Sequence, residues 1–304
     1  MRKEEGVSAP LSVARGNFDG VHIGHAGLIG RAVEYAGKTG IRSAVWTFAD
    51  GAGVLPNKPG VKCITGTEEK LALIAALGVD YVILEDFGSV RNLSPEQFVR
   101  GILKKQCRAA AAVCGFNFRF GIGGSGDSEA LRLLMAPQDC IVVPPVYLDG
   151  EPVSSSSIRA RIEAGDMETA ARLLGRRFSV SGPVVHGKEL GRTIGIPTIN
   201  QNFPDGQIVP KSGIYACLAE IDGKKYPSVT NVGIRPTIVG DSHRINCETH
   251  IIGFEGWLYD QLVTVHFYHR LRDEMKFADI EALRQQIGCD IAAAAEYFSH
   301  NEVL

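Results

Sequence analysis

The sequence has no long uninterrupted apolar stretch and no excess of basic residues. Of its 304 residues, 32 are Lys or Arg and 34 are Asp or Glu, so the formal net charge is −2 and the basic balance typical of a nucleic-acid-binding protein is missing. No stretch approaches the roughly 18 consecutive apolar residues of a membrane-spanning helix. The opening segment, MRKEEGVSAP, is charged and lacks the apolar core of a signal peptide, so we expect a cytoplasmic location.

Cysteine is present but never clustered. The seven cysteines include no Cys-x-x-Cys pair, and their number is odd. Neither a disulfide framework nor a zinc site is therefore supported, and reduced thiols are the expected state.

The composition is that of a globular protein with two domains. Hydrophobic residues make up 45% of the chain and charged residues 22%, which excludes the disordered and fibrous classes. A chain of this length has room for about two domains, each with its own core. We place the domains at residues 1–175 and 176–304, because the sequence pattern changes near Arg176.

In the first domain, short β-like runs alternate with helical stretches. Strands are expected at Leu11–Ala14, Ser43–Phe48, Asp80–Leu84, Ala110–Cys114 and Cys140–Val143. Helices are expected at Ile23–Tyr35, Thr67–Leu77, Ser94–Lys105 and Ser128–Leu134, and a further one at Met167–Leu174. Ser94 and Pro95 suit the N-cap and the first position of a helix. The alternation predicts an α/β domain whose parallel sheet is covered by helices on both faces.

In the second domain, β-rich runs follow one another without helices between them. They are Phe178–Val185, Gly213–Ile221, Lys225–Val232, Ile245–Ile252 and Leu262–Tyr268. Gly, Pro, Asn and Asp separate the runs, a pattern that predicts a small barrel or sandwich. The chain closes with an amphipathic helix whose apolar positions are Ile280, Leu283, Ile287, Ile291, Ala294 and Phe298.

The segment GNFDGVHIGH, Gly16–His25, follows the first expected strand and opens the first expected helix. A helix N-terminus favours anions, and His22 and His25 share a face because they are three residues apart. Two imidazoles aimed at one point can stabilise a phosphate as charge develops on it. The pair can instead be a fragment of a metal site, or serve only in capping and packing.

Two further segments suit a nucleotide or another phosphate-bearing ligand. In VSSSSIR, Val153–Arg159, clustered hydroxyls precede a helix and Arg159 can bind phosphate through two donors. In GFNFRFGIGGSGD, Gly115–Asp127, alternating aromatic residues and a glycine-rich loop suit a flat ring with a phosphate tail. The serines alone can be an ordinary polar loop, and the three phenylalanines of the second segment can be core.

The second domain has its own candidate phosphate site in GKELGRTIGIPTIN, Gly187–Asn200. Thr198 and Asn200 offer hard oxygen ligands on one side of an extended chain, which suits Mg²⁺ bound to ATP phosphates. The segment is not a Walker A motif, and an ordinary turn is the alternative.

Glu248, in CETHIIGF, is a candidate general base toward a substrate hydroxyl. His250 lies on the same side of that expected strand. In LRDEMKF, Arg272 and Glu274 can form a surface ion pair or help to hold a ligand. A lone strand glutamate can also simply face solvent.

Together with NVGIRPT, Asn231–Thr237, these segments occur in the order found in bacterial bifunctional riboflavin kinase/FAD synthetase, and the chain resembles that family from about Val13 to Phe298. The resemblance implies a Rossmann-like N-terminal nucleotidyltransferase domain that transfers AMP from ATP to FMN, giving FAD and pyrophosphate. It also implies a small antiparallel β-barrel kinase domain with a C-terminal helix, in which ATP phosphorylates riboflavin to FMN. Small molecules are then the expected partners, without nucleic acid or membrane.

The resemblance also implies roles for individual residues. Glu248 would be the kinase base, Mg²⁺ would bind with ATP at Thr198 and Asn200, and His22 and His25 would stabilise the α-phosphate. Ligand-binding residues of the synthetase would be Gly16, Phe18, Asp19, His22, His25, Asn117, Ser155, Ser156 and Arg159. Those of the kinase would be Gly187, Gly191, Arg192, Gly195, Pro197, Thr198, Asn200, Asn231 and Arg272.

The chain departs from the family pattern in two places. The family usually has a Pro-His-Pro-like turn where this sequence reads TFADGAGVLP, and Ser156 stands where Thr is commoner. The first difference concerns the adenylylation half. A kinase with a weakened synthetase domain, and a flavin-binding regulator, are therefore the alternatives. Aminoacyl-tRNA synthesis, which uses related chemistry, is disfavoured because a lysine-rich signature, tRNA-binding appendages and positive charge are missing.

Overall fold

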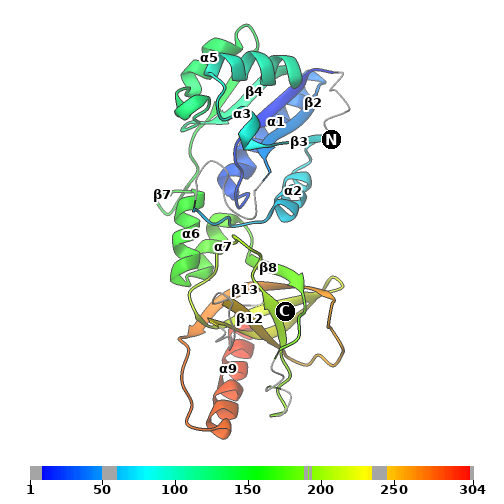
Figure 1. Cartoon of the computed structure of the whole chain (residues 1–304), viewed down its shortest axis with the longest axis vertical. Helices are drawn as coiled ribbons and strands as arrows, with labels where there is room; N and C mark the ends of the chain where they lie inside the picture. The colour runs from blue at the N-terminus through cyan, green and yellow to red at the C-terminus, as the bar shows by residue number, and fades with distance from the viewer. Residues whose placement is uncertain (1–8, 50–59, 188–190, 192–193, 235–244, 302–304) are drawn as a thin grey trace. The chain divides into compact units, whose positions relative to one another are not determined.

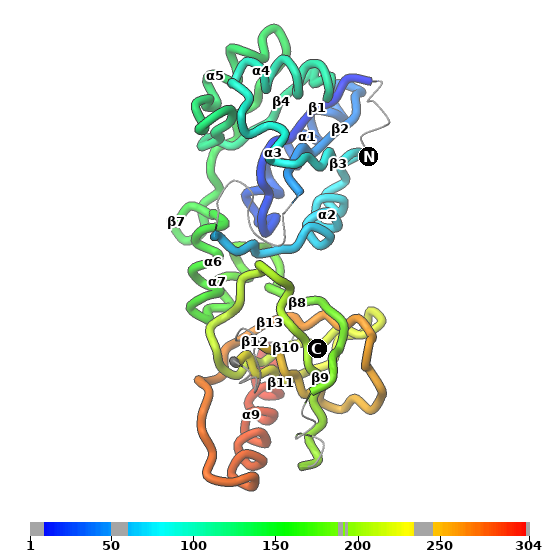
Figure 2. The backbone as a smooth tube through the Cα atoms, in the orientation of Figure 1, coloured from blue at the N-terminus to red at the C-terminus, as the bar shows by residue number. Residues whose placement is uncertain are grey.

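The computed structural model describes residues 9–49, 60–187, 191, 194–234 and 245–301. The chain divides into two compact units, Met1–Ser155 and Ser156–Leu304, whose elements can be followed from blue to red in Figure 1 and Figure 2. Within the described ranges, none of the helices is both long enough and apolar enough to cross a membrane.

The first unit is built on a parallel five-stranded sheet. Its strands are β1 (Leu11–Arg15), β2 (Arg42–Phe48), β3 (Tyr81–Glu85), β4 (Ala109–Gly115) and β5 (Asp139–Val143). Their order is β3-β2-β1-β4-β5, and every neighbouring pair is parallel. The predicted parallel sheet is confirmed, and all five β1 residues are buried, as expected for a central strand covered on both faces.

Helices cover both faces of this sheet, as predicted. On one face α1 (Ile23–Thr39) and α2 (Thr67–Ala76) pack against a core that includes Ala14 and Val45. On the other face the π-helix η1 (Phe98–Gln106) and α5 (Ser128–Met135) pack against Val13 and Trp46. The remaining short elements are α3 (Phe87–Val90), α4 (Pro95–Gln97), η2 (Ile122–Gly124), β6 (Tyr147–Leu148) and β7 (Glu151–Pro152).

The helix expected at Ser94–Lys105 begins as predicted but changes its geometry. Ser94 and Gln97 form a capping box, in which the Gln97 N–H donates to Ser94 Oγ at 3.1 Å and the Ser94 N–H donates to Gln97 Oε1 at 2.9 Å. From Phe98 onward the turns widen to π-helix, and the Cys107 N–H donates to the Ile102 carbonyl at 2.8 Å. The wider turn brings Phe98 and Leu103, five residues apart, toward the same buried side.

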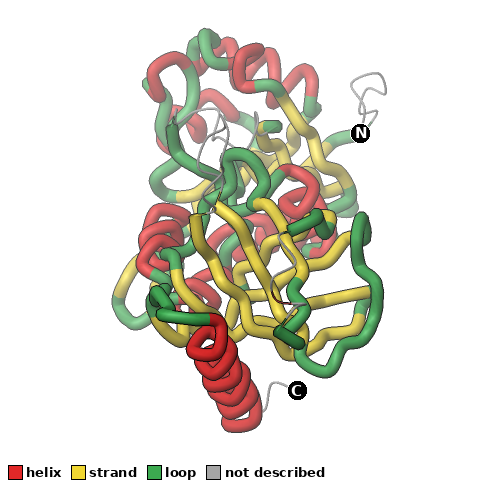
Figure 3. Tube along the Cα trace, turned by 60° about the horizontal axis from the view of Figure 1, so that its bottom comes forward, coloured by secondary structure: helices red, strands yellow, loops and turns green. Residues whose placement is uncertain are grey.

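The second unit is an antiparallel six-stranded sheet that closes almost into a barrel. Its strands are β8 (Phe178–Pro183), β9 (Ile199–Asn202), β10 (Gly213–Ile221), β11 (Lys224–Ile234), β12 (Ile245–Ile251) and β13 (Leu262–Arg272). Their order is β8-β13-β10-β11-β12-β9, and the Val185 N–H just beyond β8 donates to the Asn200 carbonyl of β9 at 2.8 Å. The predicted small barrel is confirmed, and Figure 3 shows its strands curving around one another.

Strand β9 was not among the predicted strands, because it is short and polar. Its Gln201 is fully buried, and the Gln201 amide donates to the carbonyls of Gly182 and Val263 at 2.8 Å each. A buried glutamine whose amide is bonded to the backbone is stable in a core, yet it breaks the apolar alternation by which strands are recognised.

The described helices beyond the first unit include α6 (Ser155–Ala164), whose first residue still belongs to that unit, α7 (Met167–Leu174) and α9 (Ile280–His300). Helix α9 packs on the sheet through Ala294 and Phe298. Ile280, expected on its apolar face, is instead 55% exposed at the first turn. The compact units divide at Ser155–Ser156 because α6 and α7 precede the barrel and α7 packs on β13. The boundary of the two functional domains at 175/176 stays a prediction.

Packing of the second unit predicts that substitutions at two positions of α9 change the free energy of unfolding by very different amounts. Phe298 is fully buried and meets the Tyr268 ring edge-on at 5.3 Å. We expect Phe298→Ala to lower the free energy of unfolding by about 3–5 kcal/mol, because it removes a buried ring and leaves a cavity. Urea denaturation measures this, with Ile280→Ala in the same helix as a control that changes stability by less than about 0.5 kcal/mol. Equal losses in the two variants would contradict this packing.

Candidate functional site

The Gly16–His25 segment forms a tight loop between β1 and α1. Phe18 is fully buried with a positive φ of 53°, and Gly20 has a φ of 80°. The Asp19 carboxylate is 3% exposed and accepts the backbone N–H groups of Ile64 at 2.8 Å and Thr65 at 3.4 Å. Phe18 and Asp19 therefore shape the loop from within, and their predicted contacts with a ligand, like that of Gly16, stay predictions.

His22 and His25 stack against each other at the start of α1. Their ring centroids are 3.6 Å apart and the planes differ by 16°, so the predicted shared face is present. His22 is the N-cap of α1, and its Nδ1 accepts the backbone N–H of His25 at 3.2 Å. Because Nδ1 accepts a hydrogen bond, a neutral His22 carries its proton on Nε2, which is then a donor for a ligand.

His25 is electrostatically disposed to remain neutral. Burial, and then the neighbouring His22 and Lys70, hold the pKa of His25 well below its usual value. Lys70 in α2 is fully buried, and its Nζ donates to the Phe48 carbonyl at 2.9 Å. Sequence reasoning missed Lys70, although its position four residues before the buried Ile74 places it on the inner face of α2.

The other predicted synthetase residues lie in two segments. Ser155, the last residue of the first unit, donates from Oγ to the Asp19 carbonyl at 2.9 Å. Ser156 and Arg159 lie in α6, and Arg159 is 8% exposed. Asn117 is exposed in the turn that follows β4.

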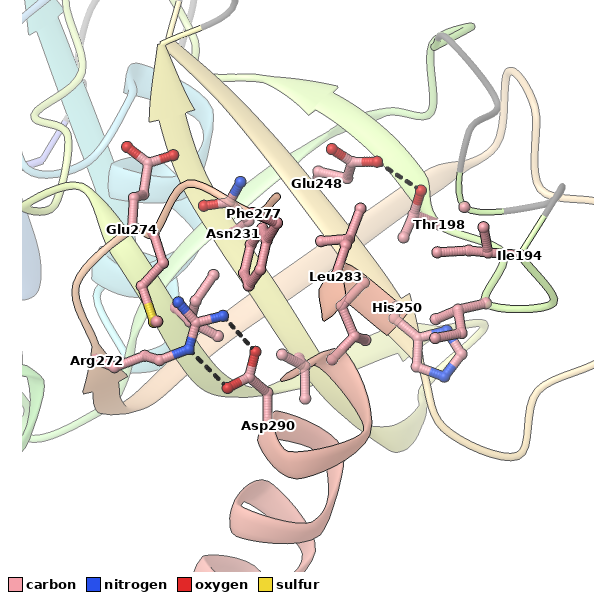
Figure 4. Close-up of a pocket in the computed structure, with 16 residues that line it drawn as sticks. Ile194, Thr198, Asn231, Glu248, His250, Arg272, Glu274, Phe277, Leu283 and Asp290 are labelled. Carbon is pink, nitrogen blue, oxygen red and sulfur yellow. Dashed lines mark hydrogen bonds and ion pairs between the residues drawn. The ribbon is translucent and has the colours of Figure 1, made fainter. Parts of the chain in front are cut away.

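The second unit holds a cavity of ≈ 200 Å³ between the barrel and α9 (Figure 4). Its walls come from the segment before β9, from β10 to β13, from the segment before α9 and from α9 itself. Described residues that line it include Gly191, Ile194, Thr198, Asn231, Glu248, His250, Arg272, Glu274, Phe277, Leu283, Ile287 and Asp290. The structure thus brings Thr198, Asn231, Glu248 and Arg272 together as predicted.

Thr198 and Glu248 meet at this cavity. Thr198 Oγ1 donates to Glu248 Oε1 at 2.8 Å, and β9 pairs with β12 in the register that sets Asn200 opposite Glu248. His250, on the same side of β12, is held by a 2.8 Å hydrogen bond between its Nδ1 and the Pro197 carbonyl. A carboxylate and a hydroxyl are therefore fixed at the wall of a cavity.

Asn200 differs from the expectation that it faces the same opening as Thr198. It is 5% exposed, does not line the cavity, and its Oδ1 accepts from Asn246 Nδ2 at 2.8 Å. A Cβ on Gly187 would lie 2.3 Å from the Asn200 amide nitrogen, so the chain at Gly187 passes directly over this side chain. Gly191 is equally constrained, because a Cβ there would lie 2.3 Å from the Ile196 carbonyl oxygen. Gly195, exposed with a φ of 78°, forms a turn.

Arg272 pairs with a residue that sequence reasoning missed. Its guanidinium donates from Nε to Asp290 Oδ1 at 2.8 Å and from Nη2 to Asp290 Oδ2 at 2.6 Å. The possible ion pair of Arg272 with Glu274 is therefore wrong, since the carboxylate partner comes from α9. The sequence did contain a sign of Asp290. It lies three residues after Ile287 and four before Ala294, so it places a charged residue on the packed face of the helix.

A second cavity, of ≈ 300 Å³, lies on the other side of Thr198. Pro197, Thr198 and the segment between β12 and β13 line it, with the aromatic side chains Phe254, Trp257 and Tyr259. Trp257 is 64% exposed, and Tyr259 stacks on His186 with centroids 4.0 Å apart. Thr198 lines both cavities, whereas Glu248 lines the first and not the second.

Three predictions concern residues outside the described ranges. They are the role of Arg192, the TFADGAGVLP segment beyond Ala49, and the last three residues of NVGIRPT.

Family models match both halves of the chain. A model described as FAD synthetase matches residues 5–157, and one described as riboflavin kinase matches residues 174–298. A bifunctional riboflavin kinase/FMN adenylyltransferase of Pseudomonas fluorescens is 37% identical over 92% of this chain and 90% of its own. This chain belongs to the bifunctional riboflavin kinase/FMN adenylyltransferase family.

Another relative and a solved structure extend the match to nearly the full length. The family member of Bacillus subtilis is 35% identical over 98% of this chain and 95% of its own. A crystal structure from Streptococcus pneumoniae, named a macrolide-efflux protein, superposes with a TM-score of 0.86 at 30% identity and covers 96% of both chains. The two-unit architecture is therefore that of a known full-length structure.

The environment of His25 predicts a pH-dependent stability. An unfolded histidine has a pKa of about 6.5, whereas burial lowers the pKa of His25 in the folded chain. As the pH falls below 6.5, the unfolded state binds a proton that the folded state does not, so stability decreases by up to about 1.4 kcal/mol per pH unit. We expect His25→Gln to remove this contribution in urea denaturation at pH 7.5 and 5.5. Identical pH slopes for both proteins would contradict the neutral, buried state of His25.

Proposed function

We propose that each unit performs one of the two reactions in the family's name. The barrel unit phosphorylates riboflavin with ATP, and the α/β unit transfers AMP from ATP to the resulting FMN, releasing pyrophosphate. The observation that carries the kinase assignment is the Thr198–Glu248 hydrogen bond of 2.8 Å at the wall of the first cavity, where Thr198 also lines the second.

The first cavity suits the flavin and the second suits the nucleotide. Apolar side chains, among them Ile214, Val229 and Leu283, line the first cavity beside the Asn231 amide, as a flat ring with polar edges requires. The second cavity offers aromatic faces for a base. Both reactants then approach Thr198 and Glu248, so the arrangement supplies the proximity on which phosphoryl transfer depends.

Glu248 acts as the general base of the kinase reaction. Its carboxylate accepts the proton of the riboflavin 5′-hydroxyl while that oxygen attacks the γ-phosphorus of ATP, and the bond to the β-phosphate oxygen breaks to release ADP. The hydrogen bond from Thr198 fixes the Glu248 carboxylate, and Asn231, opposite Glu248 in the β11–β12 pairing, presents an amide at the same wall.

We propose that Mg²⁺ arriving with ATP binds at the Thr198 hydroxyl, a hard oxygen donor at the cavity wall. Asn200, the second predicted ligand, does not fit this role in the described structure, because its Oδ1 accepts from Asn246 and the side chain lies beneath the chain at Gly187. The ion would neutralise phosphate charge. Glu248 and the flavin hydroxyl remain responsible for the proton transfer.

His22 and His25 act in adenylyl transfer. A phosphate oxygen of FMN attacks the α-phosphorus of ATP, and pyrophosphate leaves without a covalent enzyme intermediate. The His22 Nε2–H donates to the phosphate oxygens as negative charge develops, and the stacked His25 fixes the His22 ring and provides a second imidazole. As the family resemblance implies, we propose phosphate-binding roles for Ser155, Ser156 and Arg159 as well, and ligand contacts for Gly16, Phe18, Asp19 and Asn117.

We further propose a cytoplasmic location, with the functional boundary at residues 175/176. All seven cysteines are free thiols in the described structure, which supports a reducing compartment.

The two-site assignment predicts that the activities separate by mutation. Glu248→Gln should lower FMN formation from riboflavin by about 10²–10⁴-fold, because the base is lost, while leaving FAD formation from supplied FMN intact. His25→Gln should lower FAD formation by about 10²-fold and leave riboflavin phosphorylation intact. Chromatographic initial rates with each substrate measure both effects.

Glu296→Gln is the matched control for Glu248→Gln, because it makes the same chemical change at an exposed position of α9. It should leave both rates unchanged. Loss of both activities in either site variant, with the fold intact by circular dichroism, would show that the two reactions do not have separate sites.

A further inference from the structure

The charges around the first cavity are unequal. Among the described residues that line it, Arg272 carries the one formal positive charge, whereas Glu248, Glu274 and Asp290 carry negative charges. Figure 4 shows Asp290 reaching from α9 to the guanidinium of Arg272. In the cavity proposed for the flavin, Asp290 pairs with Arg272. Glu248 and Glu274 are then two further carboxylates in the described part of the wall.

The pairing of Arg272 with Asp290 is bidentate, and it joins a partly buried guanidinium to a buried carboxylate. Both carboxylate oxygens accept from the guanidinium, at 2.8 and 2.6 Å, and Asp290 is 4% exposed. Gln286 Nε2 donates to Asp290 Oδ1 at 3.1 Å, and Arg272 Nη1 donates to the Asp273 carbonyl at 2.9 Å. Bidentate geometry of this kind fixes both groups, so Arg272 presents its planar donor to the cavity while its charge is cancelled.

We infer that Asp290 is a specificity-determining residue of the kinase cavity. By neutralising Arg272, it lets the cavity bind uncharged riboflavin and disfavours the phosphorylated product, FMN. The inference rests on the proposed function, since it assigns the flavin to this cavity. Its consequence is that the dianionic phosphate formed beside Glu248 promotes release of FMN from the cavity in which it was made.

The effect of Asp290 on specificity can be measured, because the charge of Arg272 acts on the affinity for FMN and not on the affinity for a neutral flavin. At an effective dielectric constant of roughly 20–40 and a separation of roughly 10 Å, exposing the Arg272 charge changes the affinity by about four- to sixteenfold for each negative charge on the phosphate. The readout is the ratio of two inhibition constants against riboflavin phosphorylation, one for FMN and one for lumiflavin, which lacks the phosphate. A loss of packing weakens both inhibitors and leaves this ratio unchanged.

Three variants form a charge cycle, in a His25→Gln background so that FMN is not consumed. Asp290→Asn should lower the FMN-to-lumiflavin ratio by at least about fourfold, because Arg272 is left unneutralised. Arg272→Gln should raise the ratio, because Asp290 is then uncompensated. The double variant Arg272→Gln/Asp290→Asn, which leaves neither charge alone in the interior, should restore the starting ratio and is the one most able to fold.

Asp279→Asn is the matched control, since it makes the same charge change at the exposed N-cap of α9, where Asn also caps well. Its ratio should equal that of the parent. The inference would be overturned if both single variants shifted the ratio in the same direction. It would also be overturned if a single variant that folds showed no shift. Absence of riboflavin phosphorylation in the His25→Gln parent would instead refute the proposed function.

Discussion

The hydrogen bond from Thr198 to Glu248 is the contact around which the proposed kinase site is arranged. It joins residues 50 positions apart in the sequence, and it exists because β9 pairs with β12 at the seam of the barrel. Fully buried Gln201 stabilises that short strand through its two backbone hydrogen bonds. Since phosphoryl transfer requires little covalent chemistry from the protein, a barrel that holds a carboxylate and a hydroxyl in place at a cavity wall suits the proposed reaction.

The α/β unit solves a similar problem with a loop and the start of a helix. Buried Asp19 fixes the loop through the backbone of Ile64 and Thr65, and His22 caps α1 with the same ring that is proposed to meet phosphate. Stacking on His22 and proximity to Lys70 help to keep His25 neutral. In both units, then, a group proposed to act on phosphate is held in place by a partly buried hydrogen bond.

Local patterns in the sequence were enough to predict the parallel sheet, the barrel and the shared face of His22 and His25, because these follow from periodicity and spacing. Partners distant in sequence could not be predicted. The Arg272–Asp290 pair depends on how α9 docks against the barrel, and the burial of Lys70 depends on how α2 lies against β2. Strand β9 and the π-helical turns of η1 were not predicted for another reason. The buried residues of β9 are polar, and those of η1 are five residues apart, so neither shows the hydrophobic periodicity of a strand or an α-helix. Asp19 was expected to bind ligand, but its carboxylate accepts backbone N–H groups of Ile64 and Thr65 and so holds the loop in place.

The most direct test of two working sites is a chromatographic time course of the purified chain with ATP and Mg²⁺. One reaction contains riboflavin, and a parallel one contains FMN. Two complete sites predict that FMN appears and is then converted to FAD in the first reaction, and that FAD forms without delay in the second. FMN that accumulates in the first reaction with no FAD in either would contradict a functional adenylyl site, and no FMN from riboflavin would contradict the kinase site.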